Sequence, residues 1–143
     1  MLQGGSKASK RLRPAGADAP GEAGYGVGQT GVPPEEIIDL AHLARMTCGE
    51  KSLEAEVLRL FDRQAGMLLA RMQQSSPKAA GTFAHTLAGS ARGIGAWEVA
   101  AAAEGLELAA RDCDPTGFAR AHRRLAGTIG LAQAAIRSLL ATR

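Results

Sequence analysis

His85 is the residue in this sequence whose type and surroundings best suit nucleophilic chemistry. The residues from Phe83 to Ala96 favour a helix, and helical spacing gives them a core-facing row: Phe83, Leu87, Ala91 and Ile94. His85 lies two positions from Phe83 and therefore projects from the opposite side of that helix. A neutral imidazole has a free electron pair on one ring nitrogen, which could attack phosphorus.

Two glycines stand one helical turn from His85, at Gly81 and Gly89. Glycine in a helix interior costs about 1 kcal/mol relative to alanine, so the pair predicts that open access to the imidazole matters. Two cations lie further along the same face, Lys78 before His85 and Arg92 after it, and either could balance a phosphoryl group. We expect four residues to form the surface for the phosphoryl group and its partner: Lys78, Ala88, Gly89 and Arg92.

The elements that would position His85 are all predicted to be helices. Alanine and leucine dominate after residue 35, aromatic residues make up only 3 % of the chain, and no segment has the alternation of a strand. Proline and glycine punctuation divides this part into five expected helices, over about 35–46, 51–74, 77–94, 97–111 and 115 to nearly the C-terminus. Short links between long helices predict an all-α, up-and-down antiparallel four-helix bundle with a short extra N-terminal helix.

The chain divides into two parts. Residues 1–32 are rich in Gly, Pro, Ala and Ser without apolar periodicity, and we expect a flexible, disordered N-terminal tail followed by one bundle domain over 33–143. A small basic cluster lies in this tail: Lys7, Lys10, Arg11 and Arg13. Its simplest interpretation is a solvated arm, although contact with nucleic acid, lipid headgroups or an acidic partner is the alternative.

Composition narrows the function further. The net charge of +3 is mild, so we expect no nucleic-acid-binding domain. No apolar run approaches the length of a membrane span, and the N-terminus lacks the apolar segment of a signal peptide, so we expect no membrane association. The two cysteines, Cys48 and Cys113, are far apart and lack metal-ligand spacing. Together these features predict a cytoplasmic protein.

The residues around His85 resemble the histidine-containing phosphotransfer (Hpt) family. The segment His85-Thr-Leu-Ala-Gly-Ser-Ala-Arg-Gly-Ile-Gly-Ala96 is similar to the family pattern H-x-L-K-G-S-S-x-x-[LIV]-G-A, and Leu106-Glu107 resembles the L-E that ends its next helix. The segment 38–61 is similar to the first helices of bacterial Hpt domains, so the resemblance covers most of residues 34–143. One departure is Ala88, where the family usually has a lysine.

The resemblance implies a function as a phosphorelay carrier in a two-component system. His85 would be the phosphorylated nucleophile, carrying a phosphoryl group between aspartates of response-regulator receiver domains, with a hybrid histidine kinase as a further candidate partner. We expect no bound cofactor, because the receiver would supply Mg²⁺. The sequence has no Walker-type phosphate loop and no room for an ATP-binding domain, so a stoichiometric carrier is expected rather than an enzyme.

Two alternatives remain open. The missing lysine at Ala88 is also compatible with a non-catalytic Hpt-like interaction module that binds receivers or kinases without transfer. Asp39 and His42 form a carboxylate-x-x-His pair that could bind metal in a helical bundle. A di-metal bundle needs two such Glu-x-x-His pairs and further glutamates, so this second alternative is the weaker one.

Overall fold

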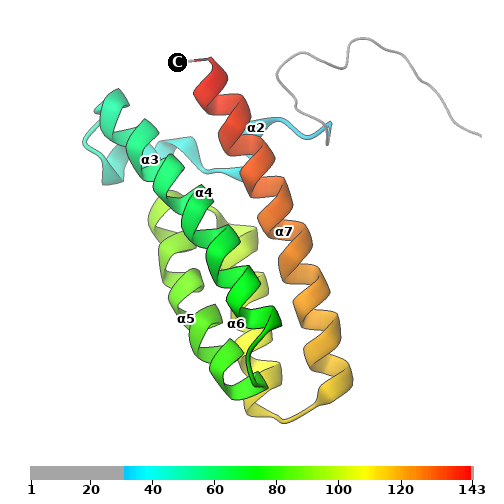
Figure 1. Ribbon diagram of the computed structural model, residues 1–143. Helices are drawn as coiled ribbons and strands as arrows, with labels where there is room; N and C mark the ends of the chain where they lie inside the picture. Colours follow the sequence, from blue (N-terminus) through cyan, green and yellow to red (C-terminus); the bar gives the residue numbers. More distant parts are fainter. Residues whose placement is uncertain (1–30, 143) are drawn as a thin grey trace, which may run out of the picture.

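The computed structural model describes residues 31–142, which form helices joined by short links, with no strand among them (Figure 1). The helices are α2 (Pro34–Ile37), α3 (Leu40–Met46), α4 (Lys51–Gln73), α5 (Pro77–Ile94), α6 (Trp97–Arg111) and α7 (Pro115–Ala141). The predicted flexible tail and its basic cluster of Lys7, Lys10, Arg11 and Arg13 lie in 1–30, outside the described residues.

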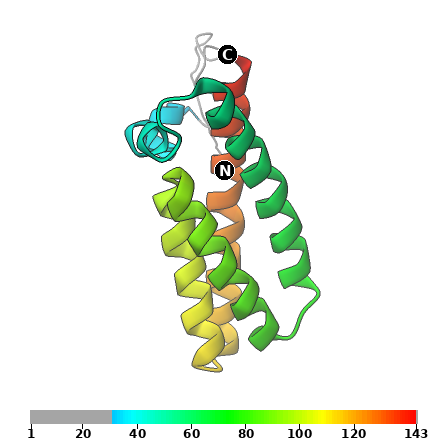
Figure 2. The same ribbon diagram turned by 90° about the vertical axis from the view of Figure 1, so that its left-hand side faces the viewer.

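The four long helices, α4 to α7, form an antiparallel bundle, and α2 and α3 lie across one end of it (Figure 1). Two or three residues separate each long helix from the next, so consecutive helices must reverse direction and pack as neighbours. Figure 2 shows α4 on one side of α5 and the yellow-green α6 on the other. The predicted up-and-down four-helix bundle is therefore confirmed.

Local capping chemistry fixes both ends of α5, the helix that bears His85. Ser76 is the N-cap, and its hydroxyl accepts a hydrogen bond from the Ala79 amide at 3.2 Å while Pro77 occupies the first turn. Gly95 ends the helix in the left-handed conformation, with φ of 84°. These are the boundaries that the sequence predicts.

The prediction of a single helix over 35–46 is wrong, because the structure has two helices there. Ile38 is extended and interrupts the helical hydrogen bonding, and Asp39 then starts α3 by accepting the His42 amide on its Oδ1 at 3.0 Å. Aspartate is one of the residues preferred at an N-cap. The Asp39 amide also donates to the Gly95 carbonyl at 3.0 Å, which fastens this break to the end of α5.

The buried face of α5 is wider than the predicted row, and it extends toward the residues that directly follow Phe83 and Leu87. Ala84, Leu87, Ala88 and Ala91 are all buried, whereas Phe83 is only partly buried. The reason is that α5 packs against α4 on one side and α6 on the other. Ala88 is 1 % exposed, so its expected place on the phosphoryl and partner surface is wrong.

Candidate functional site: the exposed histidine of α5

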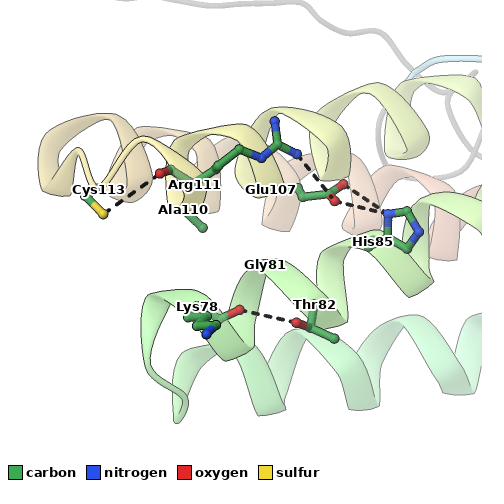
Figure 3. A pocket seen from close by; sticks show the side chains of 8 residues that line it. All are labelled: Lys78, Gly81, Thr82, His85, Glu107, Ala110, Arg111 and Cys113. Carbon is green, nitrogen blue, oxygen red and sulfur yellow. Dashed lines mark hydrogen bonds and ion pairs between the residues drawn. The ribbon is translucent and has the colours of Figure 1, made fainter.

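His85 projects from α5 toward solvent and is held by a carboxylate of the neighbouring helix. Its side chain is 75 % exposed, and Nδ1 lies 3.1 Å from Oε2 and 3.3 Å from Oε1 of Glu107 on α6 (Figure 3). A carboxylate can only accept a hydrogen bond, so Nδ1 carries the proton. In the neutral ring the free electron pair then belongs to Nε2, the nitrogen that points away from Glu107 in Figure 3.

Gly81 is the reason that α5 and α6 approach closely enough for this hydrogen bond. Gly81 is buried, and a Cβ at this position would meet the Ala110 Cβ at 3.1 Å. Its role is thus close helix packing, which corrects the expectation that both glycines keep the imidazole open. A Cβ at Gly89, in contrast, would meet nothing within 4 Å, and the surface beside it is open.

A pocket of about 580 Å³ adjoins the Nδ1 side of His85 (Figure 3). Its lining includes the cations Lys78 and Arg111, together with Thr82 and Glu107. The Arg111 guanidinium lies 3.8 Å from Glu107 Oε2, so this carboxylate stands between the imidazole and a cation. The arrangement orients His85 and keeps two positive side chains on the same face.

Arg92, the second expected cation, is paired within the bundle. Its guanidinium forms an ion pair with Glu104 of α6, and its backbone carbonyl accepts a hydrogen bond from His42 Nε2 at 2.8 Å. The structure therefore brings Lys78, Gly89 and Arg92 to the face that carries His85, with Arg92 already engaged by a carboxylate.

Glu107 and Arg111 are site residues that the sequence reasoning did not assign. In the sequence, Glu107 is marked only by its place in the family pattern. The signal that could have found it is the two-residue link at Gly95 and Ala96. His85 lies ten residues before Gly95 and Glu107 eleven after Ala96, and an antiparallel pair joined by so short a link brings such positions to the same height.

A second polar cluster, the Asp39 cluster of Asp39, His42 and Trp97, lies at the end of the bundle near α3. Trp97 Nε1 donates to Asp39 Oδ2 at 3.0 Å, and the His42 and Trp97 rings are 4.8 Å apart. The hydrogen bonds from Trp97 and from the His42 amide lower the pKa of the Asp39 carboxyl. No group of three or more potential metal ligands exists among residues 31–142, and Asp39 and His42 form hydrogen bonds within the fold instead.

A helical bundle with one exposed histidine, oriented by a carboxylate on the adjacent helix, fits the class of domains that carry a phosphoryl group on histidine. The Hpt domain family matches residues 56–141, more than half of the chain, and this chain belongs to that family. The crystal structure of a rice protein described as a histidine-containing phosphotransfer protein has the same fold, with a TM-score of 0.61 at 15 % identity. The match covers 73 % of this chain and 82 % of the rice chain.

No curated protein matches the sequence. Among the described residues, none of the helices combines the length and the apolar character needed to cross a membrane.

Proposed function

We propose that this protein carries a phosphoryl group in a two-component phosphorelay, with His85 as the phosphorylated residue. It would accept the group from the aspartyl phosphate of one receiver domain and deliver it to the aspartate of another. The observation that carries the proposal is the exposed imidazole of His85, whose Nδ1 is held by Glu107 while Nε2 remains open.

In the forward step, the electron pair of His85 Nε2 attacks phosphorus in line with the bond to the receiver carboxylate. The N–P bond forms, the P–O bond breaks, and the carboxylate leaves with the bonding pair. The Nδ1 proton stays on the ring, which becomes positively charged, and the Glu107 carboxylate stabilises that charge. In the reverse step an aspartate attacks phosphorus and the electron pair returns to Nε2.

The protein's own part in this chemistry is presentation and charge balance. Lys78 and Arg111 border the pocket beside His85 and favour the approach of an acidic receiver surface. The receiver would contribute the aspartate and Mg²⁺, and no ATP would be used by this chain. Both cysteines, Cys48 and Cys113, are free, which supports our placing the exchange in the cytoplasm.

Ala88 favours a second candidate function, a receiver- or kinase-binding module without transfer. The family usually has a lysine at this position, and here the site is a buried alanine that offers no charge. Such a module would still bind receivers through the face around His85 but would not form phosphohistidine.

The test is to incubate the protein with a receiver phosphorylated by a small-molecule phosphodonor and to measure acid-labile phosphate on the chain. We expect label on the wild type, none on His85→Gln, and wild-type labelling of His42→Gln. Label that persists in His85→Gln would overturn the assignment of the residue. Receiver binding without any transfer, unchanged by His85→Gln, would establish the non-catalytic module instead.

A further inference from the structure

A row of exposed apolar side chains runs along the outer side of α4. Leu53, Leu60 and Met67 are 38 %, 56 % and 52 % exposed, and each lies seven residues from the next. Seven residues make almost two helical turns, so the three side chains form one line, about 21 Å long at 1.5 Å per residue. Scattered exposed apolar residues are ordinary, whereas an aligned set is typical of an interaction surface. We refer to these three residues as the α4 row.

The α4 row lies on a different side of the bundle from His85. The side of α4 that carries Asp62 faces α7, because the Asp62 carbonyl accepts a hydrogen bond from Gln133 at 3.2 Å. Leu60 is two residues from Asp62 and points nearly the opposite way. His85 turns from α5 toward Glu107 on α6, and α6 and α4 lie on opposite sides of α5 (Figure 2). A partner on the α4 row would leave His85 accessible.

The charges beside the α4 row are complementary to those of a second copy. Glu56 and Arg63 are exposed, and neither forms an ion pair within residues 31–142. Glu56 lies four residues before Leu60 and Arg63 three after it, which places both on the same flank of the row. Residues on one flank meet the same flank of the partner when two helices pack antiparallel about a two-fold axis.

We propose that the α4 row is a homodimer interface, in which two copies of this chain pack antiparallel about a two-fold axis near Leu60. The row is symmetric about this residue, so Leu60 meets Leu60 of the second copy, and Leu53 meets Met67 of the second copy. Each Glu56 then approaches Arg63 of the second copy, which gives two ion pairs per dimer. A parallel arrangement would leave both charges without an opposite partner, so the charges select the antiparallel one.

The first experiment measures the mass of the full-length chain by analytical ultracentrifugation over a wide range of concentration. We expect the mass of two chains for the wild type, and a dimer dissociation constant raised by roughly tenfold or more in Leu60→Asp, since burying a like-charge pair is costly. Leu108→Asp is the matched control, because Leu108 is nearly as exposed as Leu60 but lies on α6, and it should dimerise as the wild type does. A wild type that sediments as one chain at every concentration would overturn the proposal.

The second experiment tests the antiparallel pairing by charge exchange. Glu56→Arg and Arg63→Glu should each weaken the dimer, and the double variant should recover it because every pair is restored with reversed sign. A double variant as weak as the single variants would refute the antiparallel arrangement. Circular dichroism checks that each variant is folded.

Phosphotransfer is scored separately from dimerisation. His85→Gln should dimerise like the wild type while losing phosphate uptake, so failure of the proposed function leaves the dimer visible. If Leu60→Asp instead abolishes transfer from a receiver while the wild type is monomeric, the row binds receivers and the homodimer proposal is wrong.

Discussion

Two regions of the molecule combine a histidine with a carboxylate, and they use the same residue types in different ways. At the exposed site, His85 binds Glu107 through Nδ1 and keeps Nε2 open. In the Asp39 cluster, His42 binds the Arg92 carbonyl through Nε2, and its ring packs near Trp97. The nitrogen available for attack on phosphorus in the first site is already hydrogen-bonded in the second.

The carboxylates of Glu107 and Asp39 also differ in their hydrogen-bond partners. Glu107 accepts from a side chain that reaches solvent and lies beside a pocket. Asp39 uses its two oxygens within the fold, one for the His42 amide and one for Trp97. A histidine–carboxylate pair thus becomes a candidate nucleophile only when one ring nitrogen has no partner in the fold and the surface beside it is open.

Replacing each histidine separately should give the largest difference in phosphate uptake between the two regions. His85→Gln should abolish phosphate uptake and leave stability almost unchanged, because the side chain is 75 % exposed. His42→Gln should keep phosphate uptake and lower the free energy of unfolding by about 1 kcal/mol, the usual contribution of one hydrogen bond. Transfer assays and urea unfolding measure the two effects. Equal loss of transfer in both variants would show that the two sites are not separable.

The substitution Gly95→Ala tests how strongly the Asp39 cluster depends on the backbone contact between Asp39 and Gly95. Gly95 has φ of 84°, and a Cβ there would lie 2.9 Å from both the Cβ and the carbonyl oxygen of Asp39. Gly95→Ala combines left-handed strain with a backbone clash, so we expect a loss of about 2 to 4 kcal/mol in urea unfolding.

Gly89→Ala is the matched control for Gly95→Ala, since its surroundings are open. It should raise stability by about 0.5 to 1 kcal/mol, because alanine is the better helix former. If the two substitutions have the same effect, the contact between Gly95 and Asp39 does not hold this end of the bundle together.

The ends of α5 could be predicted because the local signals there agree with the structure. Ser76 and Pro77 start α5 and Gly95 ends it, where the sequence indicates. The break at Ile38 could not be predicted in this way. It depends on the Asp39 amide reaching the Gly95 carbonyl, a contact between residues far apart in the sequence.

The site was only partly predictable for a related reason. His85 follows from its position opposite the apolar row of one helix, which is a local property. The pattern of α5 does not predict the burial of Gly81 and Ala88, because their surroundings are set by α6 and by the width of the core. Which side of a helix a neighbour covers is a property of the packed bundle, and a single helical pattern does not contain it.

Glu107→Gln removes the charge of the carboxylate that holds His85 while keeping the shape of the site. The neutral amide can still accept from Nδ1, but it no longer stabilises the charged ring that forms on phosphorylation. We expect transfer to slow by roughly ten- to a hundredfold, since a hydrogen bond to a charged group contributes about 1.5 to 3 kcal/mol.

Glu104→Gln is the matched control for Glu107→Gln, because Glu104 lies on the same helix and pairs with Arg92 instead of His85. Nitrogen NMR of the His85 ring gives a second readout, namely loss of the preference for a proton on Nδ1. Transfer that is equally slow in both variants would indicate a general charge effect on the α5–α6 face, without a special role for Glu107.

The smallest effect concerns the Asp39 carboxyl and its dependence on pH. Hydrogen bonds from Trp97 and the His42 amide lower the folded-state pKa below the usual value of 3.8. The folded state therefore binds a proton less readily than the unfolded state, and the stabilisation is complete above pH 3.8 and is lost as pH falls through the lowered pKa.

Asp39→Asn keeps an N-cap side chain but cannot ionise. We expect its unfolding free energy to vary less with pH below about 4 than that of the wild type. Parallel curves for the two proteins in urea titrations would mean that the fold does not favour the charged form of Asp39.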